Sequence, residues 1–507
     1  MTEPQSAQAP ATRRAGRTGP IIAVLCLTGT AVSLLQTMVV PLLPEFPAIF
    51  GVSGDDGSFL ITATLLTAAV GTPIISRLAD MFGKRRMMLV SLCAMIVGSL
   101  TAACGGDFVS AVLGRGLQGF SIALVPVGIS VLRDELPKTR VAGATSLMSA
   151  TLGIGGALGL PLSGFLNAHF GWQGTFWAPA AAGAVMFVAV LAIVPESRIR
   201  TPARFDYLGA VLLSGGLSAV LIVVTKGGDW GWTSKSTVTM LLAGAVFFAL
   251  WFPHELRVPH PLVDLRTSAR RPVLLTNIAS VFVGFAMYAN MLLTTQQLQL
   301  PVSSGHGFGM TVFAAGIVMI PAGMAMVIFS PVSAAVTNRF GPRTTLITGA
   351  LVMCGAYVSR VFLTNSVLVI IVGATLVSIG TAITYAAMPM LIMRSVPITE
   401  TASANGLNSL LRSIGTSTSS AFVAAILTAM VVRHGASPGL PSLTAFQTVY
   451  WTAALFSLIA TGVALCIPRG SEGTTTGLPG APDGLVTREA EMMLGRAGSH
   501  SENRCDR

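Results

Sequence analysis

The sequence predicts an all-α integral membrane protein, on the strength of its composition, its long apolar segments and the placement of its basic residues. Hydrophobic residues make up 52% of the 507 residues and charged residues only 10%, and the mean hydropathy is +0.73. A soluble protein carries about 25% charged residues. Most of the surface of this protein is therefore expected to face lipid.

Fourteen segments have the roughly 20 mostly apolar residues that a membrane-spanning helix needs. Six of them form an N-terminal six-helix half over residues 20–194, namely 20–43, 58–78, 88–104, 109–132, 144–166 and 174–194. Two lie in an insertion with its linker, residues 195–256, namely 207–225 and 237–256. Six form a C-terminal half over residues 273–467, namely 273–297, 311–333, 344–363, 367–391, 404–431 and 447–467.

The positions of lysine and arginine predict the orientation, because loops that carry these residues stay in the cytoplasm. With the N-terminus inside, all but six of the 31 basic residues fall on the cytoplasmic side. The exceptions are Lys226, Lys235, Arg360 and Arg433 on the opposite side, and Arg115 and Arg412 within spans. The protein is therefore expected in the inner (plasma) membrane with both termini in the cytoplasm.

The two tails and the longest inner loop are predicted to be cytoplasmic. They are an N-terminal tail (1–19), a loop (257–272) and a C-terminal tail (468–507). The C-terminal tail is polar and rich in Gly, Thr, Ser and Arg, a composition typical of disorder.

Several classes of function are excluded. The formal charge of +11 comes from short loops between spans and not from one basic face, so no nucleic-acid partner is expected. The six cysteines form no Cys-x-x-Cys pair, so no metal site is predicted. Without a GxxxxGK[ST], HExxH or GxSxG motif, neither an ATP-driven pump nor an enzyme is expected, and no cofactor.

The two halves contain an internal repeat. SRLADMFGKRR at Ser76–Arg86 is echoed by AAVTNRFGPR at Ala334–Arg343, and Gly83 corresponds to Gly341. Repeated halves that face a site near the midplane of the bilayer are common in secondary transporters. The predicted fold is therefore two six-helix pseudo-repeats joined by a two-helix insertion.

Three short motifs accompany the repeat. The loop signature G-x-L-a-D-r-x-G-r-[KR] is matched by Leu78, Ala79, Asp80, Gly83, Lys84 and Arg85, with Ser76 at the first glycine. The signature R-x-x-Q-G is complete at Arg115, Gln118 and Gly119. The signature G-x-x-x-G-P-x-x-G-G is approximated by Gly155, Gly156, Gly159, Pro161 and Gly164, with Leu160 inserted before the proline.

These motifs resemble those of the major facilitator superfamily, specifically its fourteen-helix drug:proton antiporter branch, over residues 20–467. The resemblance implies a secondary transporter that exports a drug, an antibiotic or a secondary metabolite by proton antiport and alternating access. The implied partners are the lipid bilayer, a small molecule and protons, and the protein is expected to be a monomer. Metabolite uptake by symport and a transport-inactive membrane sensor or scaffold are the alternatives.

The resemblance also implies roles for the motif residues. Asp80, Gly83, Lys84 and Arg85 would form a conformational latch, in which Asp80 caps a helix N-terminus or pairs with an arginine. Arg115, Gln118 and Gly119 would couple proton and substrate binding, and Gly155, Gly159, Pro161 and Gly164 would pack helices closely. A charge at the depth of Arg115 costs at least about 2.5 kcal/mol. Arg115 therefore either lines a cavity or is a structural arginine bonded to exposed carbonyl groups.

A substrate cavity is expected between the halves, formed by the first and fourth spans and their counterparts, the ninth and twelfth. The candidate lining residues are Gln36, Thr37, Asn277, Tyr288, Asn290, Tyr385 and Arg412. Since Asn405, Asn408 and Arg412 share one helical face, Arg412 either packs between helices or lines the cavity.

The first span departs from the pattern of the branch. Related antiporters commonly carry an acidic residue there, and LLQTMVVPLLP places Leu35 at its position. Glu45, Asp80, Asp134 and Glu135 are the substitutes for a proton carrier. An interior without central acids favours neutral or anionic substrates.

Overall fold

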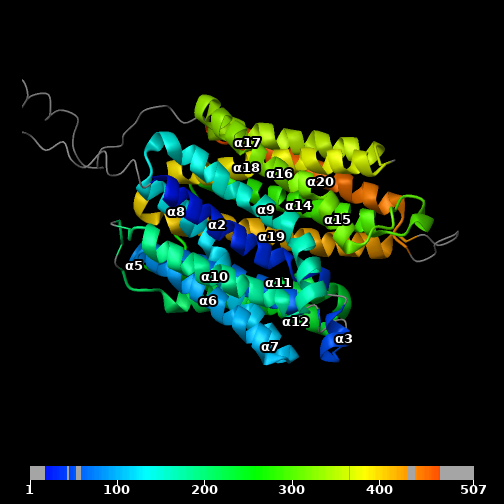
Figure 1. Cartoon of the computed structure of the whole chain (residues 1–507). Helices are drawn as coiled ribbons and strands as arrows, with labels where there is room; N and C mark the ends of the chain where they lie inside the picture. The colour runs from blue at the N-terminus through cyan, green and yellow to red at the C-terminus, as the bar shows by residue number, and fades with distance from the viewer. Residues whose placement is uncertain are drawn as a thin grey trace, which may run out of the picture. The chain divides into compact units, whose positions relative to one another are not determined.

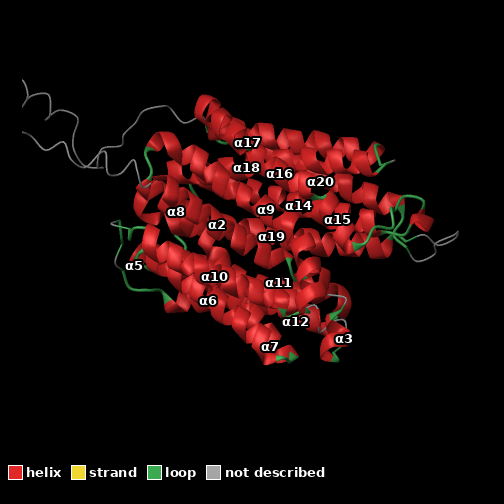
Figure 2. Cartoon of the chain, in the orientation of Figure 1, coloured by secondary structure: helices red, strands yellow, loops and turns green. Residues whose placement is uncertain are grey.

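The computed structural model describes residues 18–42, 45–52, 57, 59–197, 199–201, 203–364, 366–431 and 440–468. Regular structure in these residues is helical (Figures 1 and 2), apart from an isolated bridge between Val431 and Pro441. The predicted N-terminal tail and C-terminal tail fall almost wholly outside the described residues.

The helices follow the predicted segments in order. The first half contains α2 (Thr18–Thr37), η1 (Val40–Leu42), α3 (Phe46–Phe50), α5 (Phe59–Phe82), α6 (Lys84–Gly105), α7 (Phe108–Gly119), η2 (Phe120–Ala123), α8 (Leu124–Glu135), α9 (Lys138–Phe170) and α10 (Gly174–Ile193). The insertion and the loop after it contain α11 (Tyr207–Trp230), α12 (Lys235–Arg257) and α13 (Leu265–Ser268). The second half contains α14 (Arg271–Gln299), η3 (Val302–Ser304), α15 (Val312–Val318), α16 (Ile320–Ile328), α17 (Ser330–Phe362), α18 (Val367–Ser395), η4 (Ile398–Glu400), α19 (Thr401–Ala429) and α20 (Leu443–Leu465).

The predicted fold class is confirmed, and the count of spans depends on one glycine. Among the described residues, thirteen helices are long and apolar enough to cross a membrane. One of them, Val312–Phe362, has 51 residues, more than twice the roughly 20 that a crossing needs. Its backbone leaves the helical region at Gly341 (φ 81°, ψ 159°). The two predicted spans 311–333 and 344–363 therefore lie on either side of that turn.

The turn at Gly341 has a counterpart in the first half. Gly83, between α5 and α6, also has a positive φ (115°), a region that glycine enters without steric cost. A Cβ at Gly83 would lie 2.4 Å from a carboxylate oxygen of Glu196. The predicted correspondence of Gly83 and Gly341 thus reflects a shared backbone conformation.

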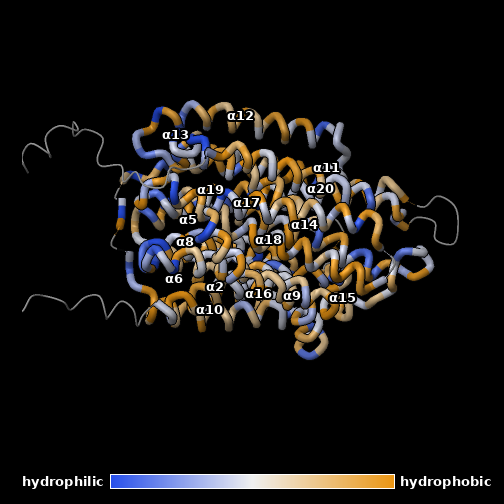
Figure 3. The backbone as a smooth tube through the Cα atoms, turned by 90° about the horizontal axis from the view of Figure 1, so that it is seen from above, coloured by the Kyte–Doolittle hydropathy of each residue, from blue (hydrophilic) through white to orange (hydrophobic). Residues whose placement is uncertain are grey.

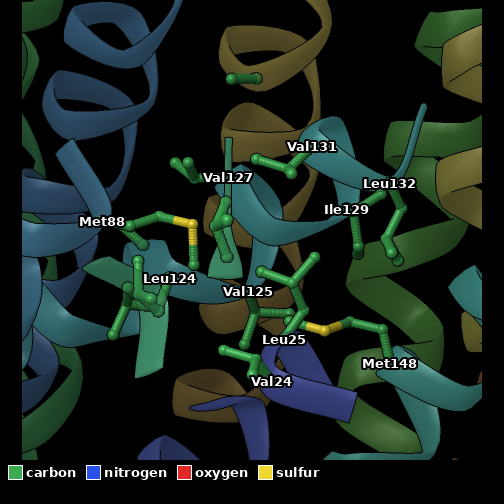
Figure 4. Close-up of a cluster of buried hydrophobic side chains, with 14 of the residues drawn as sticks. Val24, Leu25, Met88, Leu124, Val125, Val127, Ile129, Val131, Leu132 and Met148 are labelled. Carbon is green, nitrogen blue, oxygen red and sulfur yellow. The ribbon is translucent and has the colours of Figure 1, made fainter. Parts of the chain in front are cut away.

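Each half has its own apolar core. Leu25, Leu124 and Met148 belong to the core of the first half (Figure 4), and Phe285 and Phe446 to that of the second. Hydrophobic side chains also cover the outside of the helices, with Val188 and Leu368 64% and 70% exposed. In Figure 3 hydrophobic residues run along the helices, and hydrophilic ones gather where α5, α8 and α13 are labelled. An outer surface of this kind is suited to lipid.

The insertion packs against both halves. Leu213 and Leu217 of α11 share an apolar cluster with Ala69 of α5 and Leu410 of α19. The loop after α12 contributes Leu262 to the same cluster. Helix α11 therefore covers the place where a helix of the first half meets a helix of the second.

Candidate functional site

A cavity of about 220 Å³ lies between the two halves. Its walls come from α2, α5, α7, η2, α8 and α9 of the first half, from α14, α16, α18 and α19 of the second, and from Leu221 of α11. The volume is many times the roughly 10–15 Å³ that one water needs by the same measure. The space is therefore large enough for a small organic molecule.

Most of the predicted cavity residues line this space. Six of the seven candidates do so, and Arg115 joins them; the six are Gln36, Thr37, Tyr288, Asn290, Tyr385 and Arg412. The exception is Asn277, which is buried and accepts a hydrogen bond from Asn408 Nδ2 at 3.0 Å. Helices α5, α9 and α16, which carry none of the predicted lining residues, also supply lining residues.

Arg115 satisfies both of its predicted interpretations. Its Nε donates to the Leu60 carbonyl (3.1 Å), and its Nη1 donates to the Leu35 carbonyl (3.3 Å) and to Gln118 Oε1 (2.8 Å). Gln118 in turn donates to Ser99 Oγ at 2.8 Å. Although the Leu35 side chain is apolar, the backbone at that position binds the guanidinium.

The third residue of that motif allows close packing. A Cβ at Gly119 would lie 1.9 Å from Thr67 Oγ1 and 2.6 Å from the Thr64 carbonyl oxygen on α5. Thr64 also donates through Oγ1 to the Arg115 carbonyl at 3.0 Å. Gly119 therefore brings the α7 segment that carries Arg115 against α5.

The glycine-rich motif of α9 contacts two different helices. A Cβ at Gly155 would lie 2.1 Å from Ser33 Oγ on α2, and Thr37 Oγ1 donates to the Gly155 carbonyl at 2.8 Å. A Cβ at Gly159 would lie 1.8 Å from the same Thr37 oxygen. One turn further on, Pro161 contacts Gly316 of α15 and Gly164 faces Phe313. The motif thus packs α9 on α2 of its own half and on α15 of the other half.

Asp80 joins the two halves at the end of the bundle where α5 meets α6 and α18 meets α19, which we call the basic end. Its carboxylate is 1% exposed and accepts hydrogen bonds from the backbone N–H of Ala402 (3.1 Å) and Ser403 (2.8 Å). These N–H groups belong to the first turn of α19, where helix N–H groups lack intrahelical partners and favour an anion. The Asp80 carbonyl also accepts from Thr201 N at 2.9 Å.

Arg133 makes a second connection between the halves at the basic end. It donates to Thr401 Oγ1 at 2.6 Å and to the Val396 carbonyl at 3.2 Å. Arg133 is one of the basic residues from which the orientation is predicted. Nothing in its sequence neighbourhood indicates a partner more than 260 residues away.

The other predicted latch residues contact their own half. Lys84 forms a buried ion pair with Asp134 at 2.6 Å, and Ser197 Oγ donates to the same carboxylate oxygen. Arg85 donates to the Leu191 carbonyl of α10. Of the four predicted latch residues, Asp80 alone reaches the second half among the described contacts.

Arg360, which the sequence predicts to lie toward the non-cytoplasmic side, is buried in the last turn of α17. Only 2% of it is exposed, and it donates to Asn290 Oδ1 (2.5 Å), Thr294 Oγ1 (2.9 Å) and Tyr450 Oη (2.8 Å). Neutral acceptors on α14 and α20 take the place of water around the guanidinium. Asn290 and Thr294 share a helical face, which is the only signal that the sequence contained.

The cavity has a positive electrostatic character. Arg115 and Arg412 line it, and none of its described lining residues is an aspartate or a glutamate. Within the described residues, no group of three or more His, Cys, Asp or Glu side chains could hold a metal ion. Any charged occupant of this space is therefore expected to be negative.

Comparison with known proteins identifies the family. The model of the family described as Major Facilitator Superfamily matches residues 25–420 and 300–496. Multidrug resistance protein Stp of Mycobacterium tuberculosis (strain CDC 1551 / Oshkosh) is 28% identical over 390 residues, which cover 76% of this chain and 72% of that protein. The tetracenomycin C resistance and export protein of Streptomyces glaucescens is 29% identical over 68% of this chain and 63% of its own length.

Two solved structures share the fold. The human organic anion transporter MFSD10 superposes with a TM-score of 0.63 over 90% of this chain and all of that chain, at 16% identity. The proton:xylose symporter XylE superposes with a TM-score of 0.63 over 90% of this chain and 97% of that chain, at 13% identity. Because the family model matches most of the chain and the fold agrees, this chain is a multi-pass membrane transport protein of the major facilitator superfamily.

Proposed function

We propose that this protein exports small organic compounds, such as a drug, an antibiotic or a secondary metabolite, by alternating access in antiport with protons. The observation that carries the proposal is a cavity lined by both halves. A site that is shared by two rocking halves can be presented to each side of a membrane in turn. Since the cavity is formed within one chain, we propose that the protein acts as a monomer.

The direction of transport is proposed from the relatives. Their names describe multidrug resistance and the export of tetracenomycin C, and both are bacterial proteins. These names favour export over uptake, and they favour transport over a sensor or scaffold. We place the protein in the plasma membrane for the same reason.

The orientation is proposed from the basic residues, which would put the basic end and both termini in the cytoplasm. At that end, hydrogen bonds from two N–H groups of α19 to Asp80 and from Arg133 to Thr401 hold the two halves together. This arrangement supports a state that is closed to the cytoplasm. Opening toward the cytoplasm would have to break both contacts.

Asp80 is the proposed proton carrier. Among the candidates, Glu45 is exposed, and Asp134 is paired with Lys84 inside the first half. Asp80 is buried at the interface between the halves, so its surroundings change when the halves separate. A carboxylate whose surroundings alternate in this way can take up and release a proton during each cycle.

The proposed function is tested in an efflux-deficient, drug-sensitive bacterium. We expect expression of this chain to raise resistance to at least one compound of an antibiotic panel, and a protonophore to remove that resistance. Arg115→Ala should also remove it, because the substitution deletes three hydrogen bonds at the cavity wall. Arg271→Ala, at an exposed position, is the control.

Membrane levels of every variant are measured by immunoblot, so that loss of insertion is not mistaken for loss of transport. If the wild-type chain inserts normally but does not change resistance to any compound, the export proposal is wrong. That result would favour a sensor or scaffold. Increased accumulation of a labelled compound would favour uptake instead.

A further inference from the structure

We infer that the transported compounds are organic anions, and that the Arg412 guanidinium and the Tyr385 hydroxyl bind their acidic group. The inference rests on the proposed transport function and names the substrate class of the same cavity. It depends on the hydrogen bonds of the three arginines inside the bundle, on the charges around the cavity, and on one tyrosine hydroxyl that has no partner among the described residues.

The three arginines inside the bundle differ in how fully their donors are used. A guanidinium has five N–H donors and no acceptor. Arg115 and Arg360 each make three hydrogen bonds to neutral acceptors. Arg412 makes only one such bond among the described residues, from Nη2 to Ser409 Oγ at 3.2 Å. Arg412 therefore retains donors for an occupant of the cavity that it lines.

Among the described residues, no carboxylate forms an ion pair with Arg412. The described lining residues of the cavity also include no carboxylate. A guanidinium within a membrane-spanning bundle is costly without a counter-charge, and an anionic ligand that forms charge-assisted hydrogen bonds reduces that cost.

Tyr385 supplies the second group. It is 1% exposed, and its hydroxyl has no hydrogen-bond partner among the described residues. Buried hydroxyl groups nearly always have a partner, so an orphaned one within a ligand cavity indicates a missing acceptor. The residue lines the cavity together with Arg412.

The Tyr385 ring also orients the arginine. The guanidinium carbon of Arg412 lies 4.7 Å from the centroid of this ring, a distance typical of a cation–π contact. On the other side, Ser149 Oγ of α9 donates to the Tyr385 carbonyl at 3.1 Å. A serine of the first half thus holds the tyrosine that supports the arginine of the second half.

The rest of the cavity suits an apolar body. Met287, Met291, Met319 and Met326 line it, and methionine adapts its shape to irregular ligands. An acidic group at Arg412 and an apolar body against these methionines describe an amphipathic aromatic carboxylate, sulfonate or phenolate.

An anionic substrate changes the energetics of the proposed antiport. Export of one monoanion in exchange for one proton moves two elementary charges in the direction that an inside-negative potential favours. The potential would then act on both the substrate and the proton. With a neutral substrate, the membrane potential would act on the proton alone.

The test uses the purified full-length chain and pairs of probes matched in size and shape, one anionic and one neutral. The pairs are 1-naphthoate with 1-naphthamide and salicylate with salicylamide, and 1-naphthylmethylammonium is the cationic probe. Binding is measured by competition and by ligand-induced thermal shift, and transport by uptake into inverted membrane vesicles. The variants are Arg412→Ala, Arg412→Lys and Tyr385→Phe, with Arg271→Ala as the exposed control.

We expect the acids to bind and the amides to bind at least about tenfold more weakly. Arg412→Ala should weaken binding of the acids by about 10- to 100-fold and Tyr385→Phe by about tenfold, as expected for hydrogen bonds to a charged group. Arg412→Lys should restore part of the loss, because it keeps the charge without the planar fork. The affinity for the amides should change less than twofold in every variant.

Several outcomes would overturn the inference. Equal binding of acid and amide, preferential binding of the ammonium probe, or export of neutral compounds that Arg412→Ala leaves unchanged would each exclude an anion site at Arg412. Tyr385→Phe keeps the ring that packs on Arg412, so it still tests the site if Arg412→Ala does not fold. If no probe binds and the chain exports nothing in cells, the proposed function fails as well; export without anion binding would overturn the substrate class alone.

Discussion

At the scale of single residues, Arg115 and Arg360 are buried within a lipid-facing bundle without an acidic hydrogen-bond partner among the described residues. Arg115 is bonded to two backbone carbonyls and an amide, and Arg360 to an amide and two hydroxyl groups. Neutral acceptors satisfy the donors of a guanidinium but leave its charge in place. The interior of the protein therefore has a positive potential that an anion in the cavity would reduce.

The Arg360 network leads to a prediction about stability. Tyr450 accepts from Arg360 at 2.8 Å and donates to Gln297 at 2.9 Å, so Tyr450→Phe removes both bonds. We expect a loss of about 1.5–3 kcal/mol in the free energy of unfolding, as for a hydrogen bond to a charged group. The measurement is denaturant unfolding of the protein in detergent.

Tyr288→Phe is the matched control for this substitution. The Tyr288 hydroxyl makes no hydrogen bond among the described residues, and Tyr288 lines the cavity. The free energy of unfolding of the Tyr288→Phe variant should stay within about 0.5 kcal/mol of that of the wild type. Equal effects of the two substitutions would mean that the Arg360 network does not contribute to stability.

At the scale of elements, helix α9 connects the two halves through small residues on different faces. Gly155 and Gly156 are neighbours in the same sequence motif. A Cβ at Gly155 would lie 2.1 Å from Ser33 Oγ and 2.5 Å from the Ser33 carbonyl carbon. A Cβ at Gly156 would meet no heavy atom within 4 Å. The motif alone does not distinguish these two positions, because the difference depends on where α2 lies.

We therefore predict opposite effects of two adjacent substitutions. Gly155→Ala should lower the melting temperature and reduce transport, since overpacking against a backbone atom costs about 1–3 kcal/mol. Gly156→Ala should be neutral or slightly stabilising, because alanine favours a helix over glycine by up to about 1 kcal/mol. Thermal unfolding of both variants in one detergent provides the comparison, and a Gly155→Ala variant as stable as Gly156→Ala would contradict the close contact with α2.

At the scale of the whole molecule, the two halves meet at the basic end through a few polar contacts. Asp80 accepts from two N–H groups of α19, and Arg133 donates to Thr401. A carboxylate at a helix N-terminus contributes up to about 2 kcal/mol in buried geometry. This amount can change the ratio of two conformations by a factor of about ten or more.

Asp80→Asn should therefore shift the protein toward a state open at the basic end. The amide keeps one acceptor but loses the charge that favours the N-terminus of α19. We expect the population of the open state to rise by about tenfold. The measurement is the distance distribution between spin labels at two exposed positions of this end, Arg86 and Arg271, in a background without native cysteines.

Asp134→Asn is the control for this experiment. Asp134 lies at the same end but pairs with Lys84 of its own half. Its substitution should alter stability without changing the distance between the labels. If both variants shift the distances equally, the contact between Asp80 and α19 is not what holds the halves together.

Much of the molecule could be predicted from the sequence because it follows from local physics. Lipid requires about 20 apolar residues per crossing, so the spans were visible as segments. The positive φ shared by Gly83 and Gly341 belongs to a repeat that was visible as spacing. Gln36, Thr37 and Tyr385 were recognisable as polar groups on predicted spans, and they line the cavity.

Only the tertiary structure decided which polar groups meet. Arg133 donates to Thr401 across the two halves, and Arg360 is buried against α14 and α20. Among the described residues, Arg412 makes one hydrogen bond where Arg115 makes three. The physical reason is that the cost of a buried charge depends on the acceptors around it, and those acceptors come from helices distant in sequence. The sequence by itself determined a multi-spanning helical membrane protein with repeated halves, and packing determined which arginine keeps the most hydrogen-bond donors for a ligand.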